Sequence, residues 1–226
     1  MVMNKTQLTN FITKYTLGGE IKSTKWTSNG TSLSTRFISG DKSVVGKVEL
    51  NKFSHLSPCE LGVYNTGQLT SLLSVLGDDI DVNLSQSGDK FISMEFEDTN
   101  RKTKSKYMLS DLSVIPTPPA LKNLPDSFEL GIKVDPYFVN TFISGKGALS
   151  EAETFTILTE NGETKIVIGY ASIASNRVTI PVETTKSADI EPISFNANMF
   201  ASILSANKDC ESATLEVSSA GLSRIK

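Results

Sequence analysis

The sequence predicts an α+β fold built from two tandem copies of one domain. Short segments recur in the same order at an offset of 131 residues: residues 8–13 return as 139–144, and residues 71–74 return as 202–205. Periods typical of helices alternate with periods typical of half-buried antiparallel strands. A proline-rich segment separates the two halves. Together these observations predict a duplicated domain with antiparallel sheets and two helices in each copy.

Helical periodicity places two helices in the first copy. Behind the candidate cap Asn4, residues 4–17 carry apolar side chains at the spacing of one helix face, namely Leu8, Phe11, Ile12 and Tyr15. Residues 65–76 show a second stripe and end at Gly77, a residue suited to a helix end. That stripe consists of Leu69, Leu72, Leu73 and Leu76.

The strands of the first copy are predicted from alternation and turn residues. Residues 21–28 and 31–38 flank Asn29 and Gly30, a dipeptide that favours a hairpin. Further strands are expected at residues 44–50, 80–85, 90–97 and 106–115.

The second copy repeats this order. Asp135 and Pro136 predict a capped helix over 136–144, and a second helix is expected at 196–207. Strands are expected at 127–134, 154–160, 164–172, 177–183 and 213–218, with a last segment at 222–226. No counterpart of residues 107–115 follows, so copy two is predicted to be one strand short: either the chain is truncated or something else covers that sheet edge.

The domain boundaries follow from the prolines. Residues 115–125 hold Pro116, Pro118, Pro119 and Pro125, four of the eight in the chain. Eleven residues in polyproline geometry span about 34 Å at ~3.1 Å each. Domain 1 is therefore expected over residues 1–115, a strap over 116–125 and domain 2 over 126–226.

Composition excludes several classes of function. The 226 residues contain one histidine and two cysteines, with a net charge of −3, so a histidine metal site is not expected. Phosphate-loop and nucleophile-elbow patterns are not found, and the chain is predicted to be neither an enzyme nor a protein with a cofactor. No apolar run is long enough to span a membrane and no signal peptide is recognisable. We therefore expect an intracellular protein.

The predicted helices have an unusual polar face. Their exposed positions carry Asn, Gln, Ser and Thr with a few lysines, and no acid lies between cap and end. Solvated helices normally carry both signs of charge. The composition is that of a surface that faces an anion, although small polar residues are also common on short helices. The lysines in or just beyond these helices are Lys5, Lys14, Lys146 and Lys208.

With these features in place, the chain resembles the DNA sliding clamps of T-even-like bacteriophages and, more distantly, proliferating cell nuclear antigen. The resemblance lies in residues 41–50, 69–79 and 85–89 of the first copy and in residues 177–180 and 193–199 of the second. No single motif is diagnostic. Length, duplication, element order and the proline-rich strap together carry the resemblance.

The resemblance implies a homotrimeric ring of six similar units, with sheets outside and helices lining a hole through which duplex DNA passes. Such a ring acts as a processivity factor for DNA polymerase, is opened by a clamp loader and works in the cytoplasm of the infected bacterium. Whether the transcription machinery is a further partner stays open. Lys5, Lys14, Lys146 and Lys208 would face the DNA and supply a weak non-specific attraction.

The resemblance also implies two protein interfaces. Residues 107–115 of one subunit would pair with residues 177–183 of the next, through Tyr107, Leu109, Arg177, Val178 and Ile180. A partner-peptide pocket would lie under the strap, with walls from Val44, Val45, Ile115, Pro118, Leu121 and Leu124. A simpler role for the apolar strap residues is to pin the linker to the sheets.

Two alternative functions remain open from the sequence, an interaction module and an enzyme whose site cannot be recognised in one sequence. The chain is also compatible with a duplicated α+β interaction module, for example in a virion, whose helices face a protein and do not encircle DNA. A separate question concerns the basic cluster Arg101, Lys102, Lys104 and Lys106. This cluster is either a solvated loop tip or an added contact to DNA or to the loader.

Overall fold

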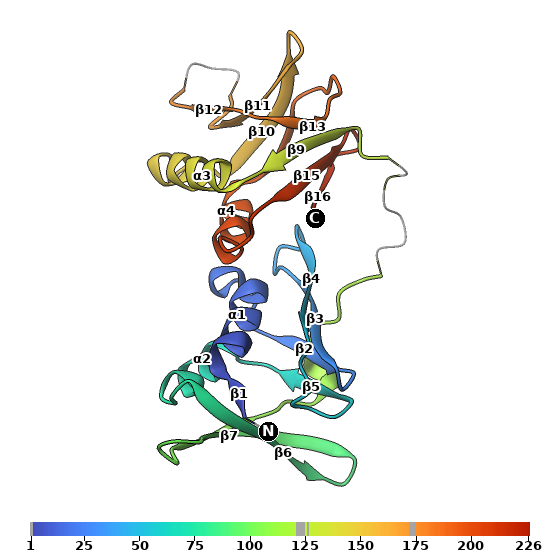
Figure 1. The fold of residues 1–226 in the computed structure, drawn as a ribbon. Helices are drawn as coiled ribbons and strands as arrows, with labels where there is room; N and C mark the ends of the chain where they lie inside the picture. Colours follow the sequence, from blue (N-terminus) through green and yellow to red (C-terminus); the bar gives the residue numbers. More distant parts are fainter. Residues whose placement is uncertain (1, 121–124, 126, 172–174) are drawn as a thin grey trace. The chain divides into compact units, whose positions relative to one another are not determined.

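The computed structural model describes residues 2–120, 125, 127–171 and 175–226. The chain divides into unit 1, Met1–Pro119, and unit 2, Ala120–Lys226, and each unit is described by itself. Over the described residues there are four four-stranded antiparallel sheets and four α-helices (Figure 1). The predicted α+β class is confirmed. The division at residues 119 and 120 falls inside the expected strap.

Unit 1 contains the same strand–helix–three-strand motif twice. The first motif is β1 (Met3–Asn4), α1 (Lys5–Thr16), β2 (Thr24–Ser28), β3 (Ser32–Ile38) and β4 (Val45–Asn51), with a 3-10 turn, Leu17–Gly19, after α1. The second is β5 (Cys59–Val63), α2 (Thr66–Ser74), β6 (Asp79–Ser87), β7 (Lys90–Asp98) and β8 (Lys104–Met108). The sheet orders are β4-β3-β2-β5 and β1-β6-β7-β8. The first strand of each motif thus completes the sheet of the other motif.

Unit 2 follows the same plan with one difference. Its elements are β9 (Leu130–Val134), α3 (Pro136–Ala148), β10 (Thr154–Glu160), β11 (Glu163–Ile168), β12 (Val178–Pro181), β13 (Thr184–Lys186), β14 (Ile193–Asn196), α4 (Ala197–Ala206), β15 (Ala213–Ser218) and β16 (Leu222–Ile225). The sheet orders are β12-β11-β10-β14 and β13-β9-β15-β16. In the described chain β16, the counterpart of β7, has β15 as its one neighbour, and β13 fills the opposite edge of that sheet.

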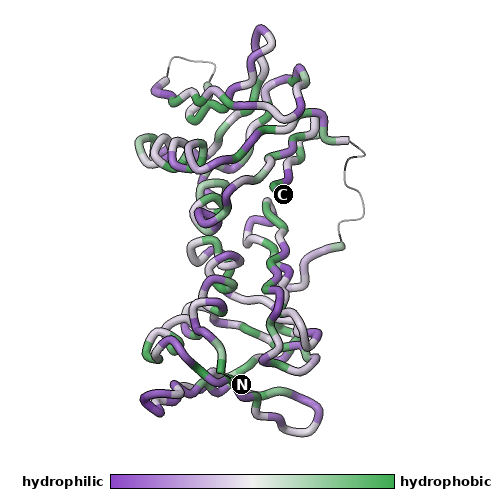
Figure 2. The backbone as a smooth tube through the Cα atoms, viewed as in Figure 1, coloured by the Kyte–Doolittle hydropathy of each residue, from purple (hydrophilic) through white to green (hydrophobic). Residues whose placement is uncertain are grey.

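Apolar helix faces form the core of each unit, and hydrophilic residues alternate with them along each helix (Figure 2). In unit 1, Tyr15 and Trp26 are almost completely buried, and the indole Nε1 of Trp26 donates a hydrogen bond of 3.2 Å to the Tyr15 hydroxyl. In unit 2, the rings of Phe142, Phe155 and Phe200 lie 4.7 to 5.1 Å apart. Aromatic contacts at this distance add stability beyond the area they bury.

Equivalent residues of the repeat occupy equivalent positions in the two units. Phe11 of α1 and Phe142 of α3 are both buried under the first helix of their unit, and Leu73 and Leu204 are both buried under the second. The helix of a motif lies against the last strand of the same motif: α1 against β4, α2 against β8 and α3 against β12.

Several strand predictions need correction. The strand expected over 106–115 ends at Met108. Beyond it, Ser110 bridges to Gly62 of β5 instead of pairing with β7, and a 3-10 turn, Leu112–Val114, follows. Strands β1, β13 and β14 were not predicted, and neither was β5. Its short sequence, in which Gly62 approaches the Ser110 carbonyl, carries no clear alternation. A Cβ at position 62 would lie 2.3 Å from that oxygen, so the crossing requires glycine.

Candidate functional site

In each unit the two helices pack against one another and share an acid-free surface. Helix α1 contacts α2, and α3 contacts α4. None of these helices contains Asp or Glu, although the chain has 25 acidic residues. Each helix starts at an Asn or Asp cap: Asn4, Asn65, Asp135 and Asn196. The helix N-termini and the missing acids make these faces compatible with a negatively charged ligand.

Two of the four lysines expected on this surface are engaged with the protein. The Lys5 ammonium group donates to the carbonyl of Leu76, just beyond the end of α2. The Lys146 side chain is only 9% exposed, and its Nζ donates to the Ser150 carbonyl at 2.7 Å. Both ammonium groups therefore satisfy carbonyls that follow a helix end, where a positive charge is favourable. As the structure stands, Lys146 does not face outward, contrary to the sequence prediction.

The other two lysines differ in exposure. Lys14 is half-buried in the last turn of α1. Lys208 is exposed, in the turn that follows α4. Lys208 is therefore the most accessible of the four candidates for an ionic contact.

The remaining surface of the helices is neutral. Exposed Thr6, Asn10 and Thr13 follow one line along α1. Along α3 the same line begins at Tyr137, which is 78% exposed. The sequence prediction did not include Tyr137, because a tyrosine in a helix with an apolar stripe is usually assigned to the core.

Acidic residues occur elsewhere, and those of β7 partly neutralise the basic cluster at residues 101–106. Glu97 lies 3.0 Å from Lys104 and 3.8 Å from Lys102, and Glu95 lies 2.8 Å from Lys106. The Lys106 hydrogen bond lowers the pKa of Glu95. These exposed pairs contribute little to stability, but the two glutamates offset half of the four positive charges of the cluster. This arrangement favours a solvated hairpin over an added DNA contact.

Strand β8 has an edge without a partner strand in the described chain. Its neighbour is β7, and the amide of Leu109 donates to the carbonyl of Ile92 at 2.9 Å. Because an antiparallel ladder alternates, the main-chain groups of Lys104, Lys106 and Met108 point to the other side. Half-buried Leu109 continues this pairing past the end of β8. The main-chain edge of β8, which is one part of the predicted subunit interface, is therefore exposed.

The Tyr107 side chain faces the core of unit 1 and is 2% exposed. Its hydroxyl accepts a hydrogen bond of 2.9 Å from the amide of Asn65, and burial raises its pKa. Neither the ring of Tyr107 nor its main-chain hydrogen-bonding groups, which face β7, are therefore available at the open edge.

Strand β12 is likewise an edge strand, paired with β11. The amide of Val182 donates to the Thr164 carbonyl, so Thr179 and Pro181 direct their main-chain groups to the open side. Pro181 has no N–H there, which shortens the edge available for pairing. Arg177, just before the strand, is exposed.

The side chains expected at this interface are only partly available. Ile180 is 3% exposed and belongs to the core of unit 2, and half-buried Val178 packs against Gly145. A charge at position 180 would therefore disrupt the fold of unit 2 itself, so Ile180 does not offer its side chain to the predicted interface.

The residues predicted to form a partner-peptide pocket are separated in unit 1. Ile115 is buried beside Gly62 of β5, whereas Val45 is in β4 and half-buried Val44 directly precedes it. Strands β4 and β5 are opposite edges of one sheet, about 14 Å apart at ~4.8 Å per strand. Ile115 and the two valines therefore do not form one wall.

The strap begins on this sheet. Pro118 is buried, and the Pro119 carbonyl accepts a hydrogen bond of 2.9 Å from Nη2 of Arg36 in β3. The strap thus runs from the β5 edge toward β3, which supports a role in pinning the linker. Leu121 and Leu124 lie outside the described residues.

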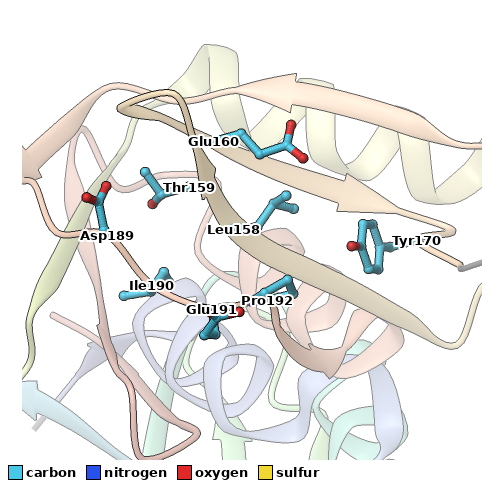
Figure 3. Close-up of a pocket in the computed structure, with 8 residues that line it drawn as sticks. All are labelled: Leu158, Thr159, Glu160, Tyr170, Asp189, Ile190, Glu191 and Pro192. Atoms are coloured by element: carbon cyan, nitrogen blue, oxygen red, sulfur yellow. The ribbon is translucent and has the colours of Figure 1, made fainter.

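A cavity of about 370 Å³ lies in unit 2 and was not predicted (Figure 3). Its lining residues are Leu158, Thr159, Glu160, Tyr170, Asp189, Ile190, Glu191 and Pro192. Glu160 is paired with Lys165 at 3.1 Å, and the Thr159 hydroxyl donates to the Ala188 carbonyl. Among the described residues, the lining offers carboxylates and one phenol but no histidine, cysteine or lysine that would form an acid–base pair with them.

Two further findings concern metals and membranes. Within the described ranges, no group of three or more His, Cys, Asp or Glu side chains is placed to hold a metal ion. The same residues contain no helix with the length and apolar character needed to cross a bilayer.

Comparison of the chain with protein-family models and with curated proteins finds no match. The geometry of the two units therefore carries the functional argument.

Proposed function

We propose that this protein is a DNA sliding clamp, made of two tandem copies of a clamp domain, that closes into a ring around duplex DNA and tethers a DNA polymerase. The observation that carries the proposal is the separation, within each unit, of an acid-free helix surface from the acidic residues. Two adjacent helices without any acid form one surface, and the acidic residues lie outside the helices, in the strands and in the connecting segments. A polyanion is favoured on the helix surface and disfavoured beside the acidic residues.

The mechanism relies on topology. A ring cannot leave a closed duplex by dissociation, so the contacts to DNA can be weak and independent of sequence. Contacts to phosphate carry no sequence information, and a neutral surface with one well-exposed lysine, Lys208, suits movement along the backbone. A bound polymerase would then be retained on its template, with a clamp loader needed to open the ring.

The two edge strands support ring closure. Strand β8 of unit 1 and strand β12 of unit 2 each have an unpaired side in the described chain, and an exposed edge is a template for pairing with another chain. Pairing β8 of one subunit with β12 of the next is head-to-tail, and it forms a ring when the rotation closes. Three chains would give six units.

Two measurements test the proposal. Native mass spectrometry should give a species of about three times 24.5 kDa. The protein should also remain on a linear duplex whose ends are blocked by a bulky protein and leave the same duplex when its ends are free. A monomer at all accessible concentrations, or equal retention on blocked and open DNA, would contradict a ring.

A duplicated interaction module is the second candidate, because some apolar side chains near the helices are exposed. Tyr137 is 78% exposed, Val75 at the end of α2 is 63% exposed and Tyr64 before α2 is 57% exposed. Aromatic side chains of this kind are frequent in protein interfaces. Equal retention on blocked and open DNA would favour this reading over a clamp.

A further inference from the structure

Resting on the proposed function, we infer that neutral side chains, and not lysine ammonium groups, make most of the contacts between these helices and DNA phosphates. The first reason is the state of the lysines. The Lys5 and Lys146 ammonium groups are bonded to the carbonyls of Leu76 and Ser150, and moving either to a phosphate would leave a carbonyl without that partner. Hydroxyl and amide side chains are alternative phosphate donors.

The second reason is a line of such side chains that recurs on the helices. On α1 the line is Thr6, Asn10 and Thr13, and the equivalent positions of α3 are Tyr137, Thr141 and Ser144. The spacing of four and then three residues keeps each set on one face. On α4 the same spacing gives Asn198, Ser202 and Ser205, and on α2 it retains Ser71 and Ser74. None of these positions is needed for the core.

At three pairs of equivalent positions the hydroxyls of the two units differ in their hydrogen bonds, although Thr141 of unit 2 also donates to a carbonyl of its own helix, that of Tyr137, at 2.8 Å. In unit 1, Thr13 donates to the Thr9 carbonyl at 2.9 Å, Ser71 to Gly67 at 3.0 Å and Ser74 to Ser71 at 2.7 Å. Their counterparts in unit 2, at the same offset of 131, are Ser144, Ser202 and Ser205. Among the described residues, these three make no side-chain hydrogen bond.

This difference predicts unequal contributions. A hydroxyl already bonded to its own helix must break that bond before it donates to a phosphate, whereas an unbonded hydroxyl does not. The hydroxyls of Ser144, Ser202 and Ser205 should therefore contribute more to DNA binding than those of Thr13, Ser71 and Ser74. Neutral contacts release no counterions, so binding should depend only weakly on salt.

The test measures binding of the full-length protein to a fluorescein-labelled linear duplex whose two ends are blocked by a bulky protein, by anisotropy at several salt concentrations. Four lysine–phosphate contacts would give each chain a slope of about −3.6 in log affinity against log salt. We expect a slope near −1 per chain, reduced further by Lys208→Ala.

The matched variants are Ser202→Ala with Ser205→Ala in unit 2 and Ser71→Ala with Ser74→Ala in unit 1. We expect the first pair to weaken binding by about threefold to tenfold at every salt concentration, in line with the loss of hydrogen bonds, and the second pair to have a smaller effect. Alanine is a good helix former, so folding should persist. Circular dichroism checks this.

The outcomes separate the two ideas. If both serine pairs bind DNA like the unchanged protein and the slope is near −3.6, the neutral-contact inference is wrong. If the serine variants weaken binding equally in both units, the inference that a hydroxyl bonded to its own helix contributes less to DNA binding is wrong. Failure of the unchanged protein to distinguish blocked from open DNA ends would instead reject the ring.

Discussion

Asn65 and Asn196 make the same hydrogen bond at equivalent positions of the two units. The Asn65 Oδ1 accepts from the amide of Gln68 at 3.0 Å, and the Asn196 Oδ1 accepts from the amide of Met199 at 2.9 Å. Each asparagine directly precedes the first residue of its helix, and so do Asn4 and Asp135 at the other pair of equivalent positions. The offset of the sequence repeat is therefore also the offset of the helix starts.

The cap gives the first prediction. Asn65→Ala should lower the free energy of unfolding of unit 1 by about 1 kcal/mol, because one amide at the start of α2 loses its acceptor. Urea unfolding followed by the fluorescence of Trp26 measures this, since Trp26 is the single tryptophan, belongs to unit 1 and is 1% exposed. Asn65→Ser retains a capping oxygen and should unfold close to the unchanged protein. Equal destabilisation by Ala and Ser would show that the cap is not responsible.

The second prediction concerns Gly46 in β4. A Cβ at this position would lie 2.2 Å from Cζ of the Phe37 ring, whereas Gly40 has nothing within 4 Å of its Cβ position. Gly46→Ala should therefore cost about 1–3 kcal/mol, as overpacking does, and Gly40→Ala should be nearly neutral. Trp26 fluorescence reports both, because β2 and β4 belong to one sheet. Similar midpoints for the two variants would contradict the close packing of Phe37.

The third prediction is a pH dependence at Asp98. Its Oδ1 accepts hydrogen bonds from the amides of Asn100 and Arg101, and its Oδ2 accepts one from the amide of Gly77. These bonds, that from Arg101 foremost, lower the pKa of Asp98. A lowered folded-state pKa stabilises the fold above the unfolded pKa of about 3.9, and this stability is lost as the pH falls.

Asp98→Asn tests this directly. The amide group places a donor where the carboxylate accepted, so unit 1 should be less stable at pH 7. The difference from the unchanged protein should narrow as the pH falls below about 4, because the carboxyl of the unfolded chain is protonated first and the native carboxylate follows at its lower pKa. Urea midpoints at a series of pH values measure the gap. A gap that is constant with pH would assign the effect to shape and not to charge.

The fourth prediction tests the β8 edge under the proposed function. The amide of Lys106 points away from β7, so Lys106→Pro removes one donor from the open edge and leaves the ladder to β7 intact. We expect this variant to sediment as a folded monomer. Lys106→Ala keeps the amide and loses the ion pair with Glu95, so it should behave as the unchanged protein. A trimer in the proline variant would place the subunit interface elsewhere.

The sequence by itself determined the class, the repeat and most of the elements. Buried stripes such as Leu8 and Phe11 in α1 recur every three or four residues, and turns such as Asn29 and Gly30 have strong local preferences. These signals depend on neighbours in the chain, which a sequence shows directly. The absence of acids from the helices was visible in the same way.

The tertiary structure alone decided which side chains are available at the candidate site. Lys146 bonds to the Ser150 carbonyl, and Ile180 belongs to the core. Ile115 and Val45 lie at opposite edges of one sheet. These facts follow from contacts between distant residues or from local packing. Strand β5 was missed for the same reason. Position 62 requires a glycine because Ser110 lies close to it, and the sequence alone does not show this contact. Periodicity gives the buried face of an element, but the pairing of elements fixes what each exposed group contacts.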